Sequence, residues 1–138
     1  MPNHFHLLVK QLSDGGITEF MRKAMHSYTK YRNIKYKRQG PVFQGIFKAV
    51  RVETDEQLVH LSRYIHLNPL VASLVSNLEH YLWSSYKDYI ISDGDPRIAK
   101  EEVLNFFNSP AQYQRFVLDH ADYAAILEQL KHVVIEED

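Results

Sequence analysis

The sequence contains no cysteine, and glycine and proline contribute only five residues each to its 138. Without cysteine the chain can form neither a disulfide nor a thiolate metal site, and such a composition suits a reducing cytoplasm. No apolar run approaches the roughly 20 residues that a membrane-spanning helix needs, so we expect no membrane partner. Gly-rich phosphate loops, GxSxG and HExxH are also missing, which argues against the classes that those motifs define. What remains is the composition of one ordinary globular domain.

Acidic side chains are scarce in the first 52 residues. This part holds ten Lys and Arg residues against two acidic ones, a balance of +8, whereas residues 53–138 have a balance of −9. Such an asymmetry favours an anionic partner for the first part of the chain, with nucleic acid as the leading hypothesis. An ordinary solvated charged surface is the alternative that the charge pattern leaves open.

The chain begins with the pattern His4-Phe5-His6 at the head of an apolar run. In a β-strand successive side chains alternate between faces, so His4 and His6 would share one face, about 6.6 Å apart. Phe5, Leu7 and Val9 would then face a core. Because neutral imidazole is the commonest side-chain metal ligand, such a strand can present two ligands to one ion. Two polar histidines on the wet face of a half-buried strand are the alternative.

A long amphipathic helix is predicted over 17–37, where apolar residues recur at steps of three and four, with Thr18 as its cap. Basic residues and tyrosines are interleaved along it. Basic side chains suit phosphates and tyrosine rings can stack on unpaired bases, although core tyrosines and ordinary solvation would give the same pattern. The Gln-Gly-Pro stretch at 39–41 would end the helix. Residues 42–52 then read as a second strand that pairs with the first.

A second helix is predicted from Thr54 or Asp55 to about Asn68, where Pro69 imposes a boundary or a kink. The aromatic-rich stretch 81–86 is expected to pack over the core. Shorter helices are expected later in the chain, over 69–75, 100–107, 110–120 and 121–134.

Three polar side chains, His60, Tyr64 and Asn68, recur at every fourth position of the second helix and so share roughly one face. A tyrosine phenol is a plausible covalent nucleophile, although its ordinary pKa of about 10 means that it needs activation. Two imidazoles from His4 and His6 and one carboxamide oxygen would leave open positions on Mg²⁺ or Mn²⁺ for a phosphate oxygen. This set suits phosphodiester transfer through a phosphotyrosine.

Other phenols compete with Tyr64 for the role of nucleophile, because spacing alone does not separate them. They are Tyr28, Tyr31, Tyr36, Tyr81 and Tyr86. The position of Tyr64 one turn before Asn68 favours it. His60, one turn earlier, could assist proton transfer or be a surface histidine, and His66 is expected on another face of the helix.

Four blocks of the sequence, MPNHFHLLV, YRNIKYKRQGPVFQGIFKAVRV, LSRYIHLNPLVASLV and LWSSYKDY, occur in this order over residues 1 to about 90. With them the chain resembles the REP-associated tyrosine transposases, bacterial relatives of the single-tyrosine transposases within the HUH endonuclease superfamily. The resemblance implies an α+β fold, an antiparallel sheet with helices packed on it in the ferredoxin-like HUH endonuclease core. A partial HUH domain would occupy 1–92, and a C-terminal helical extension of the same domain would occupy 93–138.

The resemblance also implies roles for four residues. His4 and His6 match the metal ligands, Tyr64 matches the nucleophile, and Asn68 matches a third ligand. The expected activity is metal-dependent cleavage and rejoining of single-stranded DNA at a hairpin-associated, REP-like site, through a 5′-phosphotyrosine, by a monomer or homodimer. Basic residues of the first part are the expected DNA contacts: Arg22, Lys23, Lys30, Arg32, Lys35, Lys37, Arg38, Lys48 and Arg51.

Relatives of this family carry a strand, a helix and another strand ahead of the histidine motif, which here stands at the first methionine. We therefore expect a chain that lacks its N-terminal part, or a start codon assigned too late, with an exposed sheet edge. A non-catalytic module that binds single-stranded nucleic acid is the alternative function. A structural zinc site at His4 and His6 is a third, weaker hypothesis, because structural zinc usually takes four ligands.

Overall fold

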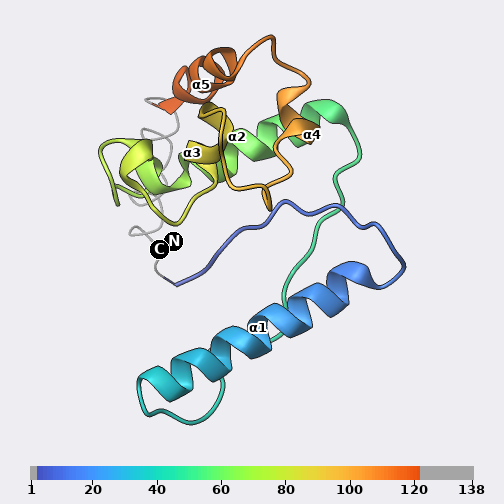
Figure 1. The fold of residues 1–138 in the computed structure, drawn as a ribbon, viewed down its shortest axis with the longest axis vertical. Coiled ribbons are helices and arrows are strands. Elements are labelled where there is room, and N and C mark those ends of the chain that lie inside the picture. The colour runs from blue at the N-terminus through green and yellow to red at the C-terminus, as the bar shows by residue number, and fades with distance from the viewer. Residues whose placement is uncertain (1–2, 122–138) are drawn as a thin grey trace, which may run out of the picture. The chain divides into compact units, whose positions relative to one another are not determined.

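A computed structural model describes residues 3–121 of the chain, and within that range all of the regular secondary structure is helical (Figure 1). The helices, in chain order, are α1 (Gly16–Lys35), α2 (Asp55–Val71), the 3₁₀ turn η1 (Leu78–His80), α3 (Tyr86–Ile90), α4 (Glu101–Leu104) and α5 (Pro110–Leu118). Within this range no helix is both long enough and apolar enough to cross a membrane. Most of the helix predicted over 121–134 lies outside the described residues.

The predicted α+β fold with an antiparallel sheet is wrong for the part of the chain that the structure describes. Neither of the two predicted strands, at the start of the chain and over 42–52, forms a β-ladder. Phe5, Leu7 and Val9, which were expected to face a core, are 46%, 50% and 43% exposed. A strand is stable only when a partner satisfies its backbone groups and a layer covers its apolar face. Alternating hydrophobicity supplies neither, so these segments remain irregular.

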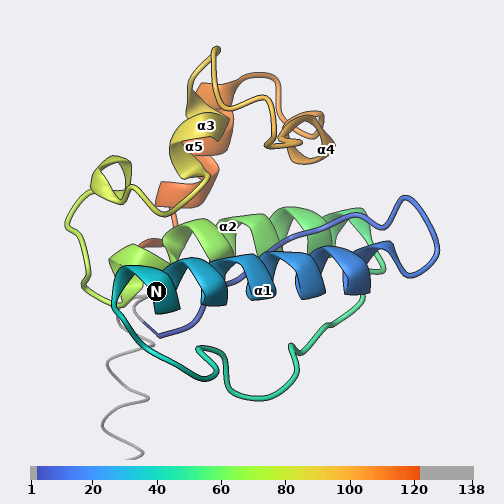
Figure 2. The same ribbon diagram turned by 60° about the horizontal axis from the view of Figure 1, so that its bottom comes forward.

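The helix predicted over 17–37 is confirmed as α1, but the predicted cap is wrong. Gly15, in the left-handed conformation with φ +67°, precedes the helix, and no side chain caps it. After α1 the chain turns and folds back alongside the helix (Figure 2). Asn33 fixes this turn, because its amide nitrogen donates to the Gly40 carbonyl over 2.9 Å. Further along, the rings of Tyr28 and Phe43 lie 5.7 Å apart between centroids.

The second predicted helix is confirmed as α2, and Thr54 is its N-cap. The Thr54 hydroxyl accepts a 3.1 Å hydrogen bond from the backbone N–H of Gln57, which satisfies one of the donors that a helix start leaves unpaired. The predicted boundary at Pro69 is wrong, because α2 continues to Val71. Pro69 lies in the last turn, where it removes one intrahelical hydrogen bond, and its own side chain is buried.

The chain divides into two compact units. We call Leu8–Arg51, with α1, the basic unit, and residues 3–7 together with 52–121, with the other helices, the core unit. In the core unit α5 packs against both α2 and α3 (Figure 1). Most of the buried apolar residues lie there: Leu67, Leu78, Tyr86, Tyr89, Val103, Tyr113 and Val117. In the basic unit the buried apolar side chain is Met21.

The expectation that residues 81–86 pack over the core holds for only part of that stretch. Tyr86 is 1% exposed, as expected. Leu82 and Trp83 are 82% and 86% exposed, so for these two the prediction is wrong. They belong to the turn between η1 and α3, where no described element covers them.

Candidate active site

The structure brings His4, His6 and Tyr64 together within the core unit, although 58 positions separate His6 from Tyr64. The ring centroids of His4 and His6 lie 5.1 Å apart with an interplanar angle of 85°. The ring of Tyr64 meets His6 edge-on, with 5.7 Å between centroids. All three side chains are exposed, Tyr64 to 55%. The phenol and both imidazoles are therefore accessible to solvent without a rearrangement of the core.

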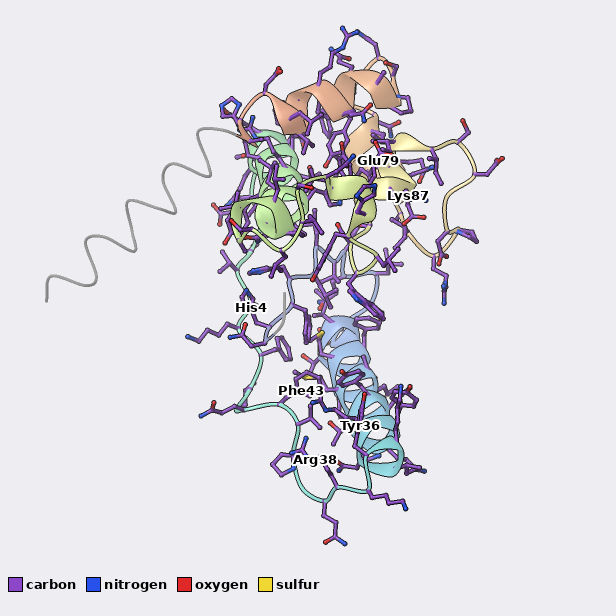
Figure 3. All side chains as sticks on the ribbon, turned by 90° about the vertical axis from the view of Figure 1, so that its left-hand side faces the viewer. His4, Tyr36, Arg38, Phe43, Glu79 and Lys87 are labelled. Carbon is purple, nitrogen blue, oxygen red and sulfur yellow. The ribbon has the colours of Figure 1, made fainter. Side chains whose placement is uncertain are left out.

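The two imidazoles have a geometry that fits a shared metal ion. A bond of about 2.1 Å from each ring nitrogen to one ion places the two ring centres about 5 Å apart when the bonds are near right angles, which agrees with the observed separation of 5.1 Å. The Nδ1 of His4 lies 2.7 Å from the side-chain oxygen of Asn3, Oδ1. Because Oδ1 can only accept, Nδ1 is the donor in this contact. Figure 3 labels His4.

The electrostatic surroundings keep His6 in the form that binds metal. Partial burial, and then the neighbouring His4, lower the pKa of His6 below its ordinary value. A neutral imidazole keeps the lone pair that a metal requires, whereas an imidazolium repels a cation. The lowered pKa therefore favours a ligating His6 at neutral pH.

Asn68, the third predicted ligand, lies one turn beyond Tyr64 on α2 and is half-buried. Its amide nitrogen Nδ2 is buried and has no hydrogen-bond partner among residues 3–121, which is costly for a buried donor. Nowhere in the same range do three or more His, Asp or Glu side chains gather as a metal cluster. The predicted donor set of two imidazoles and one carboxamide oxygen would suit Mn²⁺ better than Mg²⁺, which prefers oxygen ligands alone.

His60, the possible proton carrier, is engaged with other groups. Its Nδ1 accepts from the Arg63 guanidinium over 2.7 Å, and its ring lies 5.8 Å from that of Phe116 on α5. Arg63 also stacks over Phe116, with its guanidinium carbon 4.3 Å from the ring centroid. These contacts direct His60 toward α5. Arg63, a cation next to Tyr64 in the chain, was not among the predicted site residues, and its position within the RYIHLNP block was the available signal.

Burial excludes one rival of Tyr64. Tyr86 is 1% exposed, and therefore cannot reach a phosphate. Tyr28, Tyr31 and Tyr36 are exposed but belong to the basic unit. The nine predicted DNA contacts also all lie in the basic unit, and each except the half-buried Arg32 is exposed.

Comparisons of the chain with models of protein families, with curated proteins and with solved structures found no match.

Proposed function

We propose that the protein cleaves and rejoins single-stranded DNA in a metal-dependent reaction through a covalent bond to Tyr64. The observation that carries the proposal is the edge-on contact between the exposed Tyr64 ring and His6, at 5.7 Å, with His4 alongside. A phenol and two imidazoles from distant parts of the sequence share one accessible surface. Such a constellation is typical of a reaction centre and has no evident packing role, because none of its members is buried.

His4, His6 and the carboxamide oxygen of Asn68 would hold the divalent ion, Mn²⁺ or Mg²⁺. When bound, such an ion neutralises charge that develops on a phosphate oxygen. The residues of the chain supply the rest. The Tyr64 phenol gives its proton to solvent, and its oxygen forms a bond to phosphorus as the bond from phosphorus to the 3′ oxygen breaks. The departing oxygen takes up a proton to give a free 3′-OH, and the protein retains a 5′-phosphotyrosine.

Rejoining reverses this step with another strand. An incoming 3′-OH attacks the phosphotyrosine, and the Tyr64 oxygen leaves and is protonated. The phosphodiester count is unchanged across the two steps, so no high-energy cofactor is required.

A covalent-trapping experiment tests the proposal. A hairpin-bearing single strand, labelled at its 3′ end, is incubated with the protein and Mn²⁺, and the mixture is run on a denaturing gel. We expect a labelled protein band that EDTA abolishes. Tyr64→Phe should remove the band entirely, because it deletes the nucleophilic oxygen. The double variant His4→Ala/His6→Ala should reduce it by at least about tenfold at limiting Mn²⁺.

Tyr81→Phe is the matched control, because it removes a half-buried phenol elsewhere in the core unit and should leave the adduct unchanged. Equal adduct yields from Tyr64→Phe and the unaltered protein would eliminate Tyr64 as the nucleophile.

The second candidate function is a non-catalytic module that binds single-stranded nucleic acid. The balance of +8 and the exposed tyrosines of the basic unit favour it. It predicts salt-sensitive binding that is the same with and without metal, and no covalent band in the trapping experiment.

A further inference from the structure

Carboxylates are unevenly distributed along the basic unit. Between Phe20 and Val52 the chain has nine Lys and Arg residues and no Asp or Glu. The nearest carboxylate on α1, Glu19, is already paired, with 2.8 Å to Arg22 and 3.1 Å to Lys23. The later turns of α1 and the segment after it therefore present cations that no carboxylate of their own stretch neutralises.

The C-terminal end of α1 carries a group of four side chains that we call the tyrosine–lysine cluster: Tyr31, Arg32, Lys35 and Tyr36. The Lys35 ammonium donates a 2.9 Å hydrogen bond to the Tyr31 hydroxyl. It also lies 5.3 Å from the Tyr31 ring centroid and 5.6 Å from that of Tyr36. The Arg32 guanidinium carbon is 5.6 Å from the Tyr36 ring. The rings of Tyr31 and Tyr36 thus both lie beside the Lys35 ammonium, and the Arg32 guanidinium also lies beside the Tyr36 ring.

The rings of the cluster are not used to build the core. Tyr31 and Tyr36 are 56% and 58% exposed. The hydrogen bond from Lys35 to Tyr31, followed by the charges of the nearby phenols, raises the pKa of Lys35, so its charge is secure at neutral pH. Figure 3 shows Tyr36 at this end of α1 and Arg38 in the turn that follows. Lys37 and Arg38 are both exposed and extend the positive surface beyond the cluster.

The geometry points to the tyrosine–lysine cluster as a stacking subsite for unpaired nucleobases, in which Tyr31 and Tyr36 take base faces and Lys35 takes the intervening phosphate. Proteins that bind single strands combine these two elements, a cationic track for the backbone and aromatic rings for the bases. A duplex hides its base faces, so it can use the cations but not the rings. The occupant is therefore a single-stranded nucleic acid, and this subsite deepens the proposed function without requiring its chemistry.

Fluorescence anisotropy tests the inference with the full chain. A labelled oligo-dT of about 20 nucleotides is titrated in EDTA, and the protein carries Tyr64→Phe so that no covalent chemistry contributes. We expect Tyr31→Ala/Tyr36→Ala to weaken binding at least about tenfold, because one stacked base contributes about 1–3 kcal/mol. Tyr31→Phe/Tyr36→Phe keeps both rings, and should bind within about threefold of the parent. A duplex of equal length should bind more weakly and be insensitive to the alanine pair.

The cation is tested through salt dependence. Lys35→Met should lower the slope of log affinity against log salt by about 0.7, the value for one phosphate contact on a single strand. The matched controls are Lys87→Met and Trp83→Ala, which remove an exposed cation and an exposed ring from the core unit. Both should leave affinity and slope unchanged. Because the five altered side chains of the cluster and controls are exposed, circular dichroism and thermal melting should match the parent.

Titrations with other ligands show whether the subsite binds single-stranded nucleic acid. Oligo-U in a parallel titration distinguishes RNA from DNA, and ring-dependent binding of either strand supports the subsite. Equal affinities for the parent and the alanine pair, or an equal loss with Trp83→Ala, would overturn it. Ring-dependent binding to anionic phospholipid vesicles that oligo-dT does not displace would also overturn it, in favour of a membrane surface. The covalent band depends on Tyr64 and metal, so failure of the subsite and failure of the proposed chemistry produce different results.

Discussion

His66 is a buried histidine of the core unit, at 2% exposure, and its hydrogen bonds form one directed chain. The Ser62 hydroxyl donates to the Val59 carbonyl over 2.7 Å, so it can only accept from the Tyr113 hydroxyl at 3.2 Å. Tyr113 in turn accepts from Nδ1 of His66 at 2.7 Å. Nε2 is then the acceptor for the Ser85 hydroxyl at 2.9 Å. Every donor in the chain is used when His66 is neutral with its proton on Nδ1.

The pH dependence of stability should reflect this neutral His66. Burial, only partly offset by the charge of Asp88, lowers the pKa of His66 to about 4. The unfolded chain, with an ordinary pKa near 6.5, binds the proton more readily. The contribution is therefore fully present above pH 6.5 and is lost as the pH falls from 6.5 toward 4, by about 3 kcal/mol. Urea unfolding at a series of pH values measures it.

The variant His66→Leu isolates the contribution of His66 to the pH dependence of stability. We expect it to lower the free energy of unfolding at pH 7.5 by about 2 kcal/mol, because Ser85 and Tyr113 lose a buried partner. Its stability should also fall less steeply than that of the parent between pH 6.5 and 4. His80→Gln, at an exposed position, should change neither quantity. Parallel pH curves for the parent and His66→Leu would contradict the assignment.

At the scale of the helices, the two longest ones begin in different ways. The first turn of α2 carries a side-chain cap from Thr54, followed by the carboxylates of Asp55 and Glu56, which suit the positive end of a helix dipole. The first turn of α1 has Glu19 but no side-chain cap, and the left-handed Gly15 makes the entry turn instead. The same residue type, threonine, is thus a cap at 54 and an ordinary helix residue at 18.

Substitution of the two threonines should separate these roles. Thr54→Ala should lower the free energy of unfolding by about 1 kcal/mol, because the N–H of Gln57 loses its acceptor. Thr18→Ala should leave it unchanged or slightly raised, since alanine is the better helix former. Urea unfolding followed by circular dichroism compares the pair. A larger loss of unfolding free energy from Thr18→Ala than from Thr54→Ala would contradict these two roles.

At the scale of the whole molecule, burial and charge are divided between the units. Among residues 3–121, the buried apolar side chain of the basic unit is Met21 on α1, and the others lie in the core unit. The basic unit instead holds all nine predicted DNA contacts. Local stability follows buried apolar contact, and mutual repulsion of like charges reduces it. The unit with the excess of positive charge is therefore the unit with the smaller core.

Native-state hydrogen exchange should show this difference. We expect amides in the middle of α1 to exchange at a lower free energy than those in the middle of α2. Addition of oligo-dT should then slow exchange at the C-terminal end of α1 and leave α3 and α5 unaffected. Exchange of α1 and α2 at the same free energy would mean that the two units unfold as one.

The sequence by itself determined the helices that carry their own signals. The steps of three and four over 17–37 and the Thr54 cap depend on residues close together in the chain, so α1 and the start of α2 could be predicted. The row of Tyr64 and Asn68 follows from helical periodicity in the same way. The end of α2 could not be predicted, because the free-energy cost of Pro69 in the helix depends on whether its turn has other stabilising contacts.

Only the tertiary structure decided the rest, because it depends on residues far apart in the chain. An alternating apolar pattern is compatible with a strand, but a sheet requires partners that a local pattern does not supply, and among residues 3–121 none forms. The contact of His6 with Tyr64 and the buried chain around His66 join positions that no spacing rule connects. Residue chemistry and helical periodicity were therefore determined locally, whereas burial and the assembly of the site were determined by packing.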